Sequence, residues 1–453
     1  MTIPQPQPAE GAPGALYRAF WRWHFYAGLL VMPILMLMAL TGGLYLFKDE
    51  IDGLVYRPLL VVPPAATSTP PQAWADAATR AVPGRLVQLV PPAEATRSAK
   101  LVIETADGSN RAVYVDPHDA RALGSIPDGG VMQVIKRIHS LDIAGPVFNL
   151  LVEVVAGWVI VMVATGVVLW WPRGPAGGVV SVRAGPSRRV FWRDLHAVTG
   201  VFAGGVIVFL AVTGMPWSAV WGQQVRKLTT DAGWGRPEAP ASAAAWSHGP
   251  SHKPATPAVP WALQETEVPA HNHEGMGLNL DDALARIEAA GLSRPYALSI
   301  PAEPGKAWSA SYMPDKVEEM RTLYLDGSDG RVIADIGYGR FGHAAKAIEW
   351  GISVHQGQQF GLLNKLIMLT GCLAIWQLGV SALVMWWKRR PKGRLAAPPR
   401  PVGRRVYAAL AAVVVPLAIL YPLVGASLIA VLALDFVIRR IASAVPPSLE
   451  ARP

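Results

Sequence analysis

Cysteine and charge are the two features that this sequence has little of. Its 453 residues include one cysteine, Cys372, which lies within an apolar run. A single cysteine excludes an internal disulfide, a cysteine-ligated cluster and the C-x-x-C-H attachment of haem. Only 16% of the residues are charged, whereas 51% are hydrophobic. A soluble chain of this length would carry more charge, so the composition indicates a polytopic α-helical membrane protein.

Nucleotide-binding motifs are also missing. The sequence has no P-loop, dinucleotide fingerprint or nucleophile elbow, so ATP-driven transport and the binding of flavin or nicotinamide have no support. A net charge of +9 can indicate nucleic-acid binding. Here the basic residues cluster beside the apolar runs, as the positive-inside rule predicts for a protein in membrane lipid, and we expect no nucleic-acid partner.

Two stretches repeat each other, and each places a histidine at the start of an apolar run long enough to cross a bilayer. His24 lies in FWRWHFYAGLLVMPILMLMALTGGLYLF, and His196 lies in FWRDLHAVTGVFAGGVIVFLAVTGMPWSAVW. In both stretches a glycine follows the histidine by four residues and a Thr-Gly pair begins seventeen residues after it. Apolar composition alone does not reproduce this phase, so we predict an internal repeat of a membrane helix.

A second pair of histidines precedes a second pair of spans. His139 lies 31 residues before Trp170, and His355 lies 31 residues before Trp386. A glycine follows each of these histidines by six residues. The unit of span, soluble domain and span therefore occurs twice, and we expect a four-helix core built from this tandem repeat.

The expected organisation divides the chain into consecutive segments. They are a disordered cytoplasmic leader (1–15), the first span (16–48), a first soluble α+β domain (49–138), the second span (139–173), a cytoplasmic loop (174–190), the third span (191–221), a second soluble domain (222–354) with a flexible insert (231–276), the fourth span (355–388), a basic cytoplasmic linker (389–405), a C-terminal helical hairpin (406–440) and a tail (441–453). Within the soluble domains we predict amphipathic helices at 71–82 and 279–292, a β-hairpin at 100–125 and a strand pair at 306–335.

Arginine placement orients the spans. With the arginine-rich loops inside, both termini are cytoplasmic and both soluble domains face outward, which in a bacterium is the periplasm beyond the inner membrane. This places His24 and His196 near the cytoplasmic face, and His139 and His355 near the outer face. A span of about 20 residues rises roughly 30 Å, so histidines at opposite faces cannot share one iron, whereas same-face pairs can.

Same-depth imidazoles on facing helices are typical axial ligands of haem. We therefore predict two b-type haems, one held by His24 and His196 and one by His139 and His355, which together would carry electrons across the membrane. The alternative is that the four are ordinary interfacial histidines, although two copies with matched intervals and depth argue against it.

Other residues are supporting candidates. Arg22 and Arg193 lie just before their histidines and could bind haem propionates, or serve only as positive-inside anchors. Small residues could admit a flat macrocycle or serve helix packing: these are Gly28, Gly42, Gly200 and Gly214.

Three further groups of polar residues are open to more than one interpretation. Glu153 could relay a proton or pair with a cation within the second span. Asn149 and Asn364 could be hydrogen-bond donors around the outer site, and His343 could be an alternate outer ligand. The insert also holds histidines whose spacing matches no closed metal site, so we expect only adventitious binding there: these are His248, His252, His271 and His273.

The pattern resembles the PepSY-associated transmembrane proteins, which include bacterial inner-membrane ferric-siderophore reductases. The resemblance rests on FWRWHFYAGL…TGGLYLF, YVDPHDARALG before IHSLDIAG, VVLWWPRG, DLHAVTGVFAG…LAVTGMPW, YLDGSDGRVIAD before VHQGQQFGLLNK, and MWWKRR. It covers about residues 16 to 390, so the C-terminal hairpin lies outside it, and the long insert departs from the compact pattern. The resemblance implies a four-helix core holding b-type haem through these four histidines, periplasmic PepSY-like domains, and electron delivery to a ferric siderophore.

Two functions follow as expectations. The first is an oxidoreductase, a haem-dependent ferric-siderophore reductase that takes electrons from a cytoplasmic or quinol donor, or a haem subunit for another periplasmic acceptor. The second is a non-catalytic PepSY membrane protein that binds or regulates periplasmic partners, in which the histidines are incidental.

Overall fold

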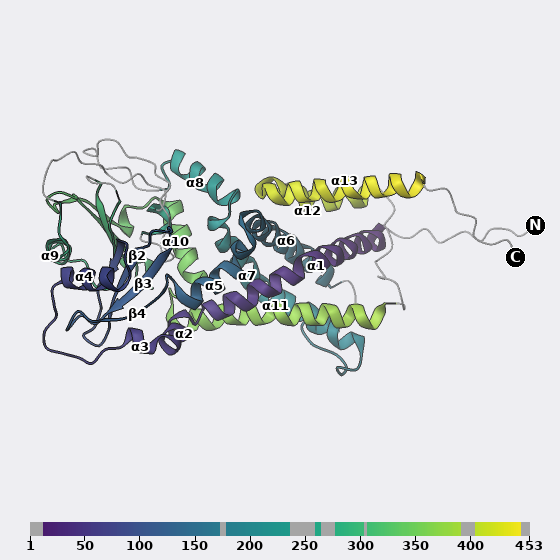
Figure 1. Ribbon diagram of the computed structural model, residues 1–453. Coiled ribbons are helices and arrows are strands. Elements are labelled where there is room, and N and C mark those ends of the chain that lie inside the picture. Colours follow the sequence, from purple (N-terminus) through teal and green to yellow (C-terminus); the bar gives the residue numbers. More distant parts are fainter. Residues whose placement is uncertain are drawn as a thin grey trace, which may run out of the picture. The chain divides into compact units, whose positions relative to one another are not determined.

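The computed structural model describes residues 12–172, 178–235, 259–263, 277–302, 306–390 and 404–444 (Figure 1). The chain divides into two compact units, which are described separately. The helical unit comprises Met1–Leu40, His139–Gln224 and Ile367–Pro453, and the sheet unit comprises Thr41–Ile138 and Val225–Leu366. Most of the expected leader, most of the insert, most of the basic linker and most of the tail lie outside the described residues. The insert histidines His248, His252, His271 and His273 also lie outside them.

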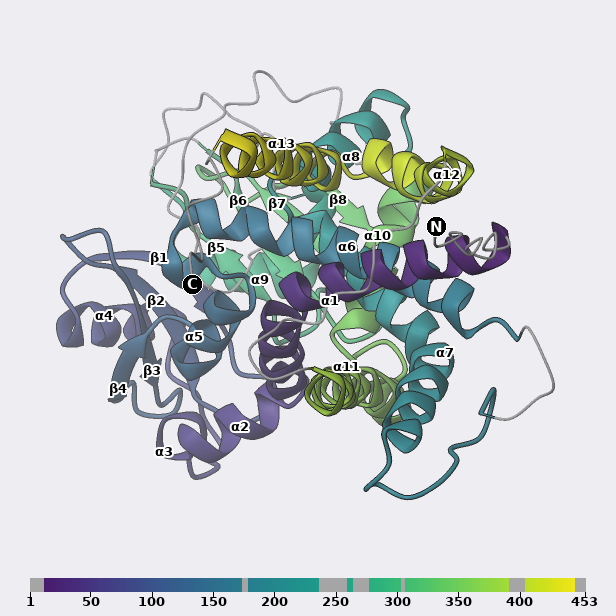
Figure 2. The same ribbon diagram turned by 90° about the vertical axis from the view of Figure 1, so that its right-hand side faces the viewer.

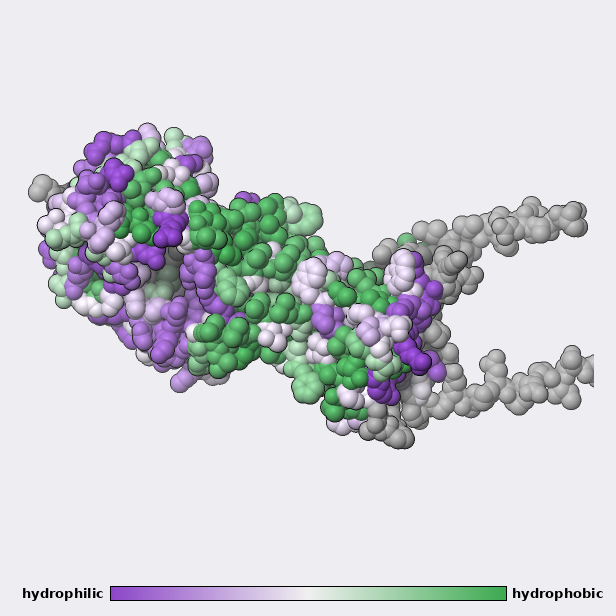
Figure 3. All heavy atoms as spheres, turned by 90° about the horizontal axis from the view of Figure 1, so that it is seen from below, coloured by the Kyte–Doolittle hydropathy of each residue, from purple (hydrophilic) through white to green (hydrophobic). Residues whose placement is uncertain are grey.

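Four helices of the described chain are long and apolar enough to cross a membrane, as the sequence predicts. They are α1 (Ala12–Tyr45), α6 (Pro146–Trp170), α7 (Arg189–Gly214) and α11 (Gly361–Arg389). Large apolar side chains such as Leu30, Phe202 and Leu373 are exposed on them, and a space-filling view shows hydrophobic residues gathered over their surface (Figure 3). Such a surface is stable in lipid and not in water.

The span boundaries differ from the predicted ones by several residues. α1 begins within the expected leader, and α7 gives way at Met215 to a 3₁₀ turn (Met215–Trp217) that contains Pro216. The second and fourth spans begin after their histidines, at Pro146 and Gly361, because a turn separates histidine and span. Gly145 (φ 112°) and Gly361 (φ 60°) supply the positive φ that ends each turn, a conformation that side chains with a Cβ rarely adopt.

A C-terminal hairpin packs against α6, as seen in Figure 2. It consists of α12 (Arg404–Leu420) and α13 (Pro422–Ala444), in agreement with the predicted hairpin. Gly157 of α6 allows a close approach, because a Cβ there would lie 2.2 Å from a methyl group of Val424. At the next residue of α6, the Nε1 atom of Trp158 donates a hydrogen bond to Ser427 Oγ at 2.9 Å.

The two soluble segments, expected as two domains, share one eight-stranded antiparallel sheet with the order β4-β3-β2-β1-β5-β6-β7-β8. Its strands are β1 (Arg85–Val90), β2 (Ala99–Glu104), β3 (Asn110–Val115), β4 (Ala122–Pro127), β5 (Ala297–Ser299), β6 (Trp308–Tyr312), β7 (Arg321–Leu325) and β8 (Val332–Gly337). The halves join where β1 pairs with β5, with Leu89 opposite Leu298. This pairing covers an edge of each half-sheet that would otherwise expose unpaired backbone groups.

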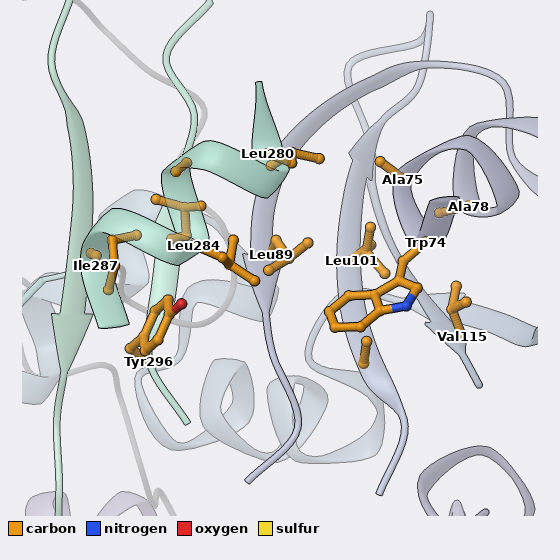
Figure 4. Packing of buried hydrophobic residues seen from close by; sticks show 14 of the residues in the cluster. Trp74, Ala75, Ala78, Leu89, Leu101, Val115, Leu280, Leu284, Ile287 and Tyr296 are labelled. Atoms are coloured by element: carbon orange, nitrogen blue, oxygen red, sulfur yellow. The ribbon is translucent and has the colours of Figure 1, made fainter. Parts of the chain in front are cut away.

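One face of the sheet is covered by the two predicted amphipathic helices, α4 (Pro71–Ala81) and α9 (Leu280–Ala289). Their apolar side chains point at the strands, as Figure 4 shows for Trp74 and Leu284, which pack in one core with Leu89. Each half of the sheet therefore has the same order of elements, one helix followed by four strands.

The opposite face of the second half-sheet is covered by α10 (His343–His355) and by Trp261–Leu263, a short 3₁₀ turn. This corrects the expectation that the insert is flexible throughout 231–276. Trp261 and its neighbours are buried, because an apolar triplet gains more by packing on the sheet than by exposure to water. The remaining helices are α2 (Lys48–Val55), α3 (Arg57–Leu60), α5 (Gly130–His139) and α8 (Trp221–Asp231).

Candidate functional site

His24 of α1 and His196 of α7 lie side by side within the helical unit. Their ring centres are 6.3 Å apart, and the ring planes stand at 86° to each other. The structure therefore brings together the two histidines that the sequence repeat predicts at one depth.

The His24 ring is held through its Nδ1 atom. Nδ1 lies 3.0 Å from Oγ1 of Thr165 in α6. The Thr165 hydroxyl directs its own hydrogen to the carbonyl oxygens of Val161 and Met162, at 2.9 and 3.0 Å, so its oxygen accepts from the imidazole. This network assigns the hydrogen of His24 to Nδ1.

His196 is held in the same way by α11. Its Nδ1 lies 3.1 Å from the carbonyl oxygen of Leu378 and 3.0 Å from Oγ of Ser381. A carbonyl oxygen can only accept, and the Ser381 hydroxyl donates to that same carbonyl at 3.0 Å. His196 therefore also carries its hydrogen on Nδ1.

Because the hydrogen of each imidazole is on Nδ1, the Nε2 atom of each ring carries a lone pair. In the described part of the chain, no hydrogen bond is formed by either Nε2 atom. This is how proteins present histidine to a metal: one ring nitrogen donates to a fixed acceptor, and the other offers its lone pair. Metal–imidazole bonds are about 2.0–2.1 Å long, so two axial rings on one iron have centres about 6 Å apart. The distance of 6.3 Å between the ring centres is compatible with one metal ion between the two rings.

His139 is the last residue of α5, and it also donates from Nδ1, to the carbonyl oxygen of Met38 at 3.0 Å. The chain then turns through Gly145 into α6. Asn149 fastens this turn, since its Nδ2 donates to the carbonyl of Ser140, the residue after the histidine, at 2.9 Å.

His355 has a matching local environment in the sheet unit. It is the last residue of α10, and a turn through Gly361 follows. Asn364 donates to the carbonyl of Val354, the residue before the histidine, at 2.9 Å. Both asparagines thus bind backbone beside a histidine and not a histidine ring. His139 and His355 belong to different units, and their pairing stays a prediction.

The separation of His24 from His139 follows from the rise of helix α1. Met38, which His139 contacts, lies 14 residues after His24 in α1. At 1.5 Å per residue, the two histidines are separated by about 21 Å along the helix axis. We call these depths the His24 level and the His139 level. One iron could not bridge two side chains this far apart, and the binding of a metal at either level stays a prediction.

The arginines predicted to bind propionates already have protein partners. The Arg22 guanidinium lies 5.0 Å from the ring centre of Tyr26, and Arg193 forms an ion pair with the buried Asp194 at 2.6 Å. Arg183 binds the same carboxylate at 2.8 Å. A role toward a ligand at this end would require Arg22 or Arg193 to exchange these contacts.

The predicted small residues show ordinary packing. A Cβ at Gly28 would lie 3.5 Å from Met162, and one at Gly200 would lie 3.8 Å from Leu378. Helix packing in this structure therefore does not require glycine at either position. Gly42 and Gly214 lie near the C-terminal ends of α1 and α7.

Glu153 is buried, with 1% of its surface exposed. Its Oε2 accepts the backbone N–H groups of Val220 and Trp221, each at 3.1 Å, where α8 begins. Its Oε1 is buried and has no hydrogen-bond partner in the described part of the chain.

Two further histidines of the sheet unit, His343 and His118, differ from His355 in position and in hydrogen-bond partners. His343 begins α10, twelve residues before His355, which is about 18 Å along the helix. It therefore cannot substitute for His355 at the same iron. His118 joins two loops, since its ring nitrogens lie 2.7 Å from the Thr67 carbonyl and 2.8 Å from the Ala95 carbonyl. These bonds raise the pKa of His118, because both ring nitrogens must donate.

Thr165 and Ser381 are the site residues that the sequence analysis missed. Each is a hydroxyl residue within an apolar run, and a polar side chain in such a run marks a helix face that looks into the bundle. This signal was available for both residues, but their contacts to histidine required the three-dimensional packing.

The described residues include no group of three or more histidine, cysteine, aspartate or glutamate side chains that could hold a metal ion. An axial haem pair would need only two protein ligands, so this finding does not bear on the predicted haem sites. Comparison with curated proteins gives no match. The family model described as the PepSY-associated TM region matches residues 21–389, which include all four predicted histidine ligands and the four spans except the first turns of the first one. The chain belongs to this family of PepSY-associated transmembrane proteins.

Proposed function

We propose that this membrane protein is a two-haem oxidoreductase of the bacterial inner membrane, which passes electrons outward to reduce a periplasmic ferric siderophore. Its tandem layout of span, soluble segment and span would place one haem near each face. The acceptor rests on the resemblance to ferric-siderophore reductases, and other ferric chelates belong to the same chemical class.

The observation that carries the proposal is the state of the His24–His196 pair. Both rings donate from Nδ1 to fixed helix groups, both leave Nε2 free, and their centres are 6.3 Å apart. One ring nitrogen fixed by a hydrogen bond and the other left available is the way proteins present histidine to a metal, and both rings share this arrangement. An iron between them accounts for both Nε2 atoms.

Bound b-type haem would supply reversible one-electron chemistry at iron. The residues of the chain do the rest. His24 and His196 bind at one level, and His139 would bind at the other, where His355 is the predicted second ligand. Thr165 and the Leu378 carbonyl hold the imidazoles in the tautomer that ligates and make them more basic. The surrounding apolar core, which includes Val31, Val161 and Ile375, excludes water from the pair.

The direction of transfer follows from charge. The His24 level lies toward the Arg183–Asp194–Arg193 cluster, two residues from His196 in α7, and basic residues at span ends favour the cytoplasmic side. We therefore assign entry of electrons from a cytoplasmic or quinol donor to the His24 level. Delivery belongs to the His139 level and the sheet unit, which we place in the periplasm.

The test is haem content and donor-specific reduction of the wild type, His196→Ala and His355→Ala in membrane vesicles. His355→Ala should keep reduction of the inner haem by a cytoplasmic-side donor but abolish reduction of an external ferric chelate. His196→Ala should block entry from that donor, yet leave the outer haem reducible by a reductant added outside. Arg22→Lys, which keeps the charge beside His24, is the control and should support normal transfer.

Absence of haem from the purified wild type would contradict the proposal and leave the non-catalytic PepSY function. If reduced protein were reoxidised quickly by another periplasmic acceptor and by no ferric siderophore, the electron path would stand and the acceptor would be wrong.

A further inference from the structure

Helix α2 exposes apolar side chains and turns polar ones toward the protein. Leu54 is 81% exposed and Val55 is 52% exposed. Asp52 and Tyr56 lie about 160° around the helix from Leu54. One carboxylate oxygen of Asp52 is buried, and the Tyr56 hydroxyl accepts a hydrogen bond from the Val131 N–H at 2.8 Å. A surface helix in water has the reverse arrangement, with its apolar side against the protein.

The chain places α2 at the end of a span. The span α1 ends at Tyr45, and α2 begins at Lys48 (Figure 1). Three residue steps extend over at most about 11 Å, so α2 begins within this distance of the end of α1. The headgroup region of a bilayer has a similar thickness on each side of the hydrocarbon.

An ion pair ties α2 to the start of another span. Glu50 binds Lys365 of α11 at 2.6 Å, and the Lys365 ammonium lies 5.2 Å from the ring centre of Phe47. Lys365 lies four residues after Gly361, where α11 begins, which is about 6 Å along the helix. A lysine so close to the end of a span extends its ammonium group to the membrane surface. All of these residues belong to the sheet unit, so α2 is held at this depth by contacts within one unit.

Apolar exposure continues at the start of α11. Phe360, the residue before this helix, is 59% exposed, and its ring centre lies 6.2 Å from that of the partly exposed Trp350 of α10. Leu362 and Leu363, which begin the span, are also exposed. Tryptophan is typical of the boundary between lipid and water, and exposed leucine at the start of a span is typical of a surface that faces lipid.

We propose that α2 is an interfacial membrane anchor, whose Leu54 and Val55 side chains insert among the lipids at the membrane surface where α1 ends and α11 begins. Lipid is the occupant of this apolar face because the face is continuous with the spans, which lipid already surrounds. The inference does not depend on haem or on the direction of electron transfer.

The anchor reaches the sheet through α3, which follows α2 directly. Leu59 of α3 packs on β4, since a Cβ at Gly124 would lie 2.9 Å from a methyl group of this leucine. An α2 helix fixed in the headgroup region would therefore hold the first half of the sheet at a constant height above the lipid.

The experiment measures the accessibility of nitroxide spin labels on single cysteines of the full-length protein in phosphatidylethanolamine–phosphatidylglycerol nanodiscs. The one cysteine of the chain, Cys372, is buried, and Cys372→Ala provides the background. A label at Leu54→Cys should respond more strongly to oxygen, which partitions into lipid, than to a water-soluble nickel chelate. Asp49→Cys is the matched control, because Asp49 lies on the same helix about 140° around the axis from Leu54. Its label should respond more strongly to the nickel chelate.

Equal access of the nickel chelate to both labels would place Leu54 in water and overturn the inference. A Leu54→Cys label shielded from both reagents would overturn it as well, because protein would then cover this face; broadening by a neighbouring spin would identify that protein as a second copy of the chain. If the Leu54→Cys protein cannot be purified, Val55→Cys provides the same comparison with Asp49→Cys, and the same outcomes decide.

Discussion

Oγ1 of Thr165 accepts a hydrogen bond from Nδ1 of His24 at 3.0 Å, across the contact between α6 and α1. The bond fixes both the orientation of the ring and the nitrogen that stays free. Replacing Thr165 with valine keeps the shape and removes the acceptor, so we predict that haem affinity at this level falls by about 10–100-fold. Haem retention during dilution, followed by absorbance, measures this effect.

Thr213→Val is the control for that substitution. The Thr213 hydroxyl donates to the carbonyl of Phe209 within α7 at 2.6 Å, so it resembles Thr165 in its bond to its own helix. It should leave haem retention unchanged. Equal losses in the two variants would mean that Thr165 acts through helix stability and not through His24.

Glu349 makes the sheet unit sensitive to pH. Burial raises the pKa of its carboxyl from 4.5 to about 7, although a hydrogen bond from the Ala262 N–H and the charge of Arg226 act in the opposite direction. Because the folded pKa is raised, the stabilisation is complete below about pH 4.5 and is lost as pH rises through 7. The loss is on the order of 3 kcal/mol at most.

Hydrogen exchange of the Trp261–Leu263 amides, corrected for intrinsic rates, should therefore show weaker protection at pH 8 than at pH 5. Glu349→Gln should remove this dependence, because an amide cannot ionise. Protection that is the same at both pH values in the wild type would show that Glu349 does not hold this segment through its charge state.

The junction of the two half-sheets is formed by a buried leucine pair. Leu298 is fully buried opposite Leu89 in the β1–β5 pair. Leu298→Ala leaves a cavity in the shared core and should lower the free energy of unfolding of the sheet unit by about 2–5 kcal/mol. Leu54→Ala, at an 81% exposed position of α2, should cost far less. Amide exchange should accelerate in β1 and β5 together; acceleration confined to β5 would mean that the halves open independently.

The sequence predicted most of the architecture because periodic patterns determine it. Apolar runs predicted the four spans and the hairpin. Amphipathic spacing predicted the α4 and α9 helices, and alternation predicted the strands around Asp107–Gly108. The union of the two soluble segments in one sheet was not predictable from these patterns, since β5 is only three residues long and its partner lies in another segment. A pairing so distant in sequence leaves no local signal.

For the site, repeat spacing identified His24 and His196 correctly as neighbours. It could not predict Thr165 or Ser381, because a hydroxyl in an apolar run has no fixed spacing to the histidine that it contacts. It placed His139 before the second span, but it did not predict that His139 ends a separate helix, α5. The positive φ at Gly145 separates helix from span, and a glycine in an apolar context does not by itself reveal that turn.

The central claim is that His24 and His196 bind one haem and that His139 belongs to another. The most direct measurement is the haem content of four purified variants: His24→Ala, His196→Ala, the double variant of these two, and His139→Ala combined with His24→Ala. Because ligands of one site are not additive, the first three should each retain half of the wild-type haem, and the last should retain none. If the His24→Ala, His196→Ala double variant lost all haem while each single variant lost half, the two histidines would belong to different sites and the account would be contradicted.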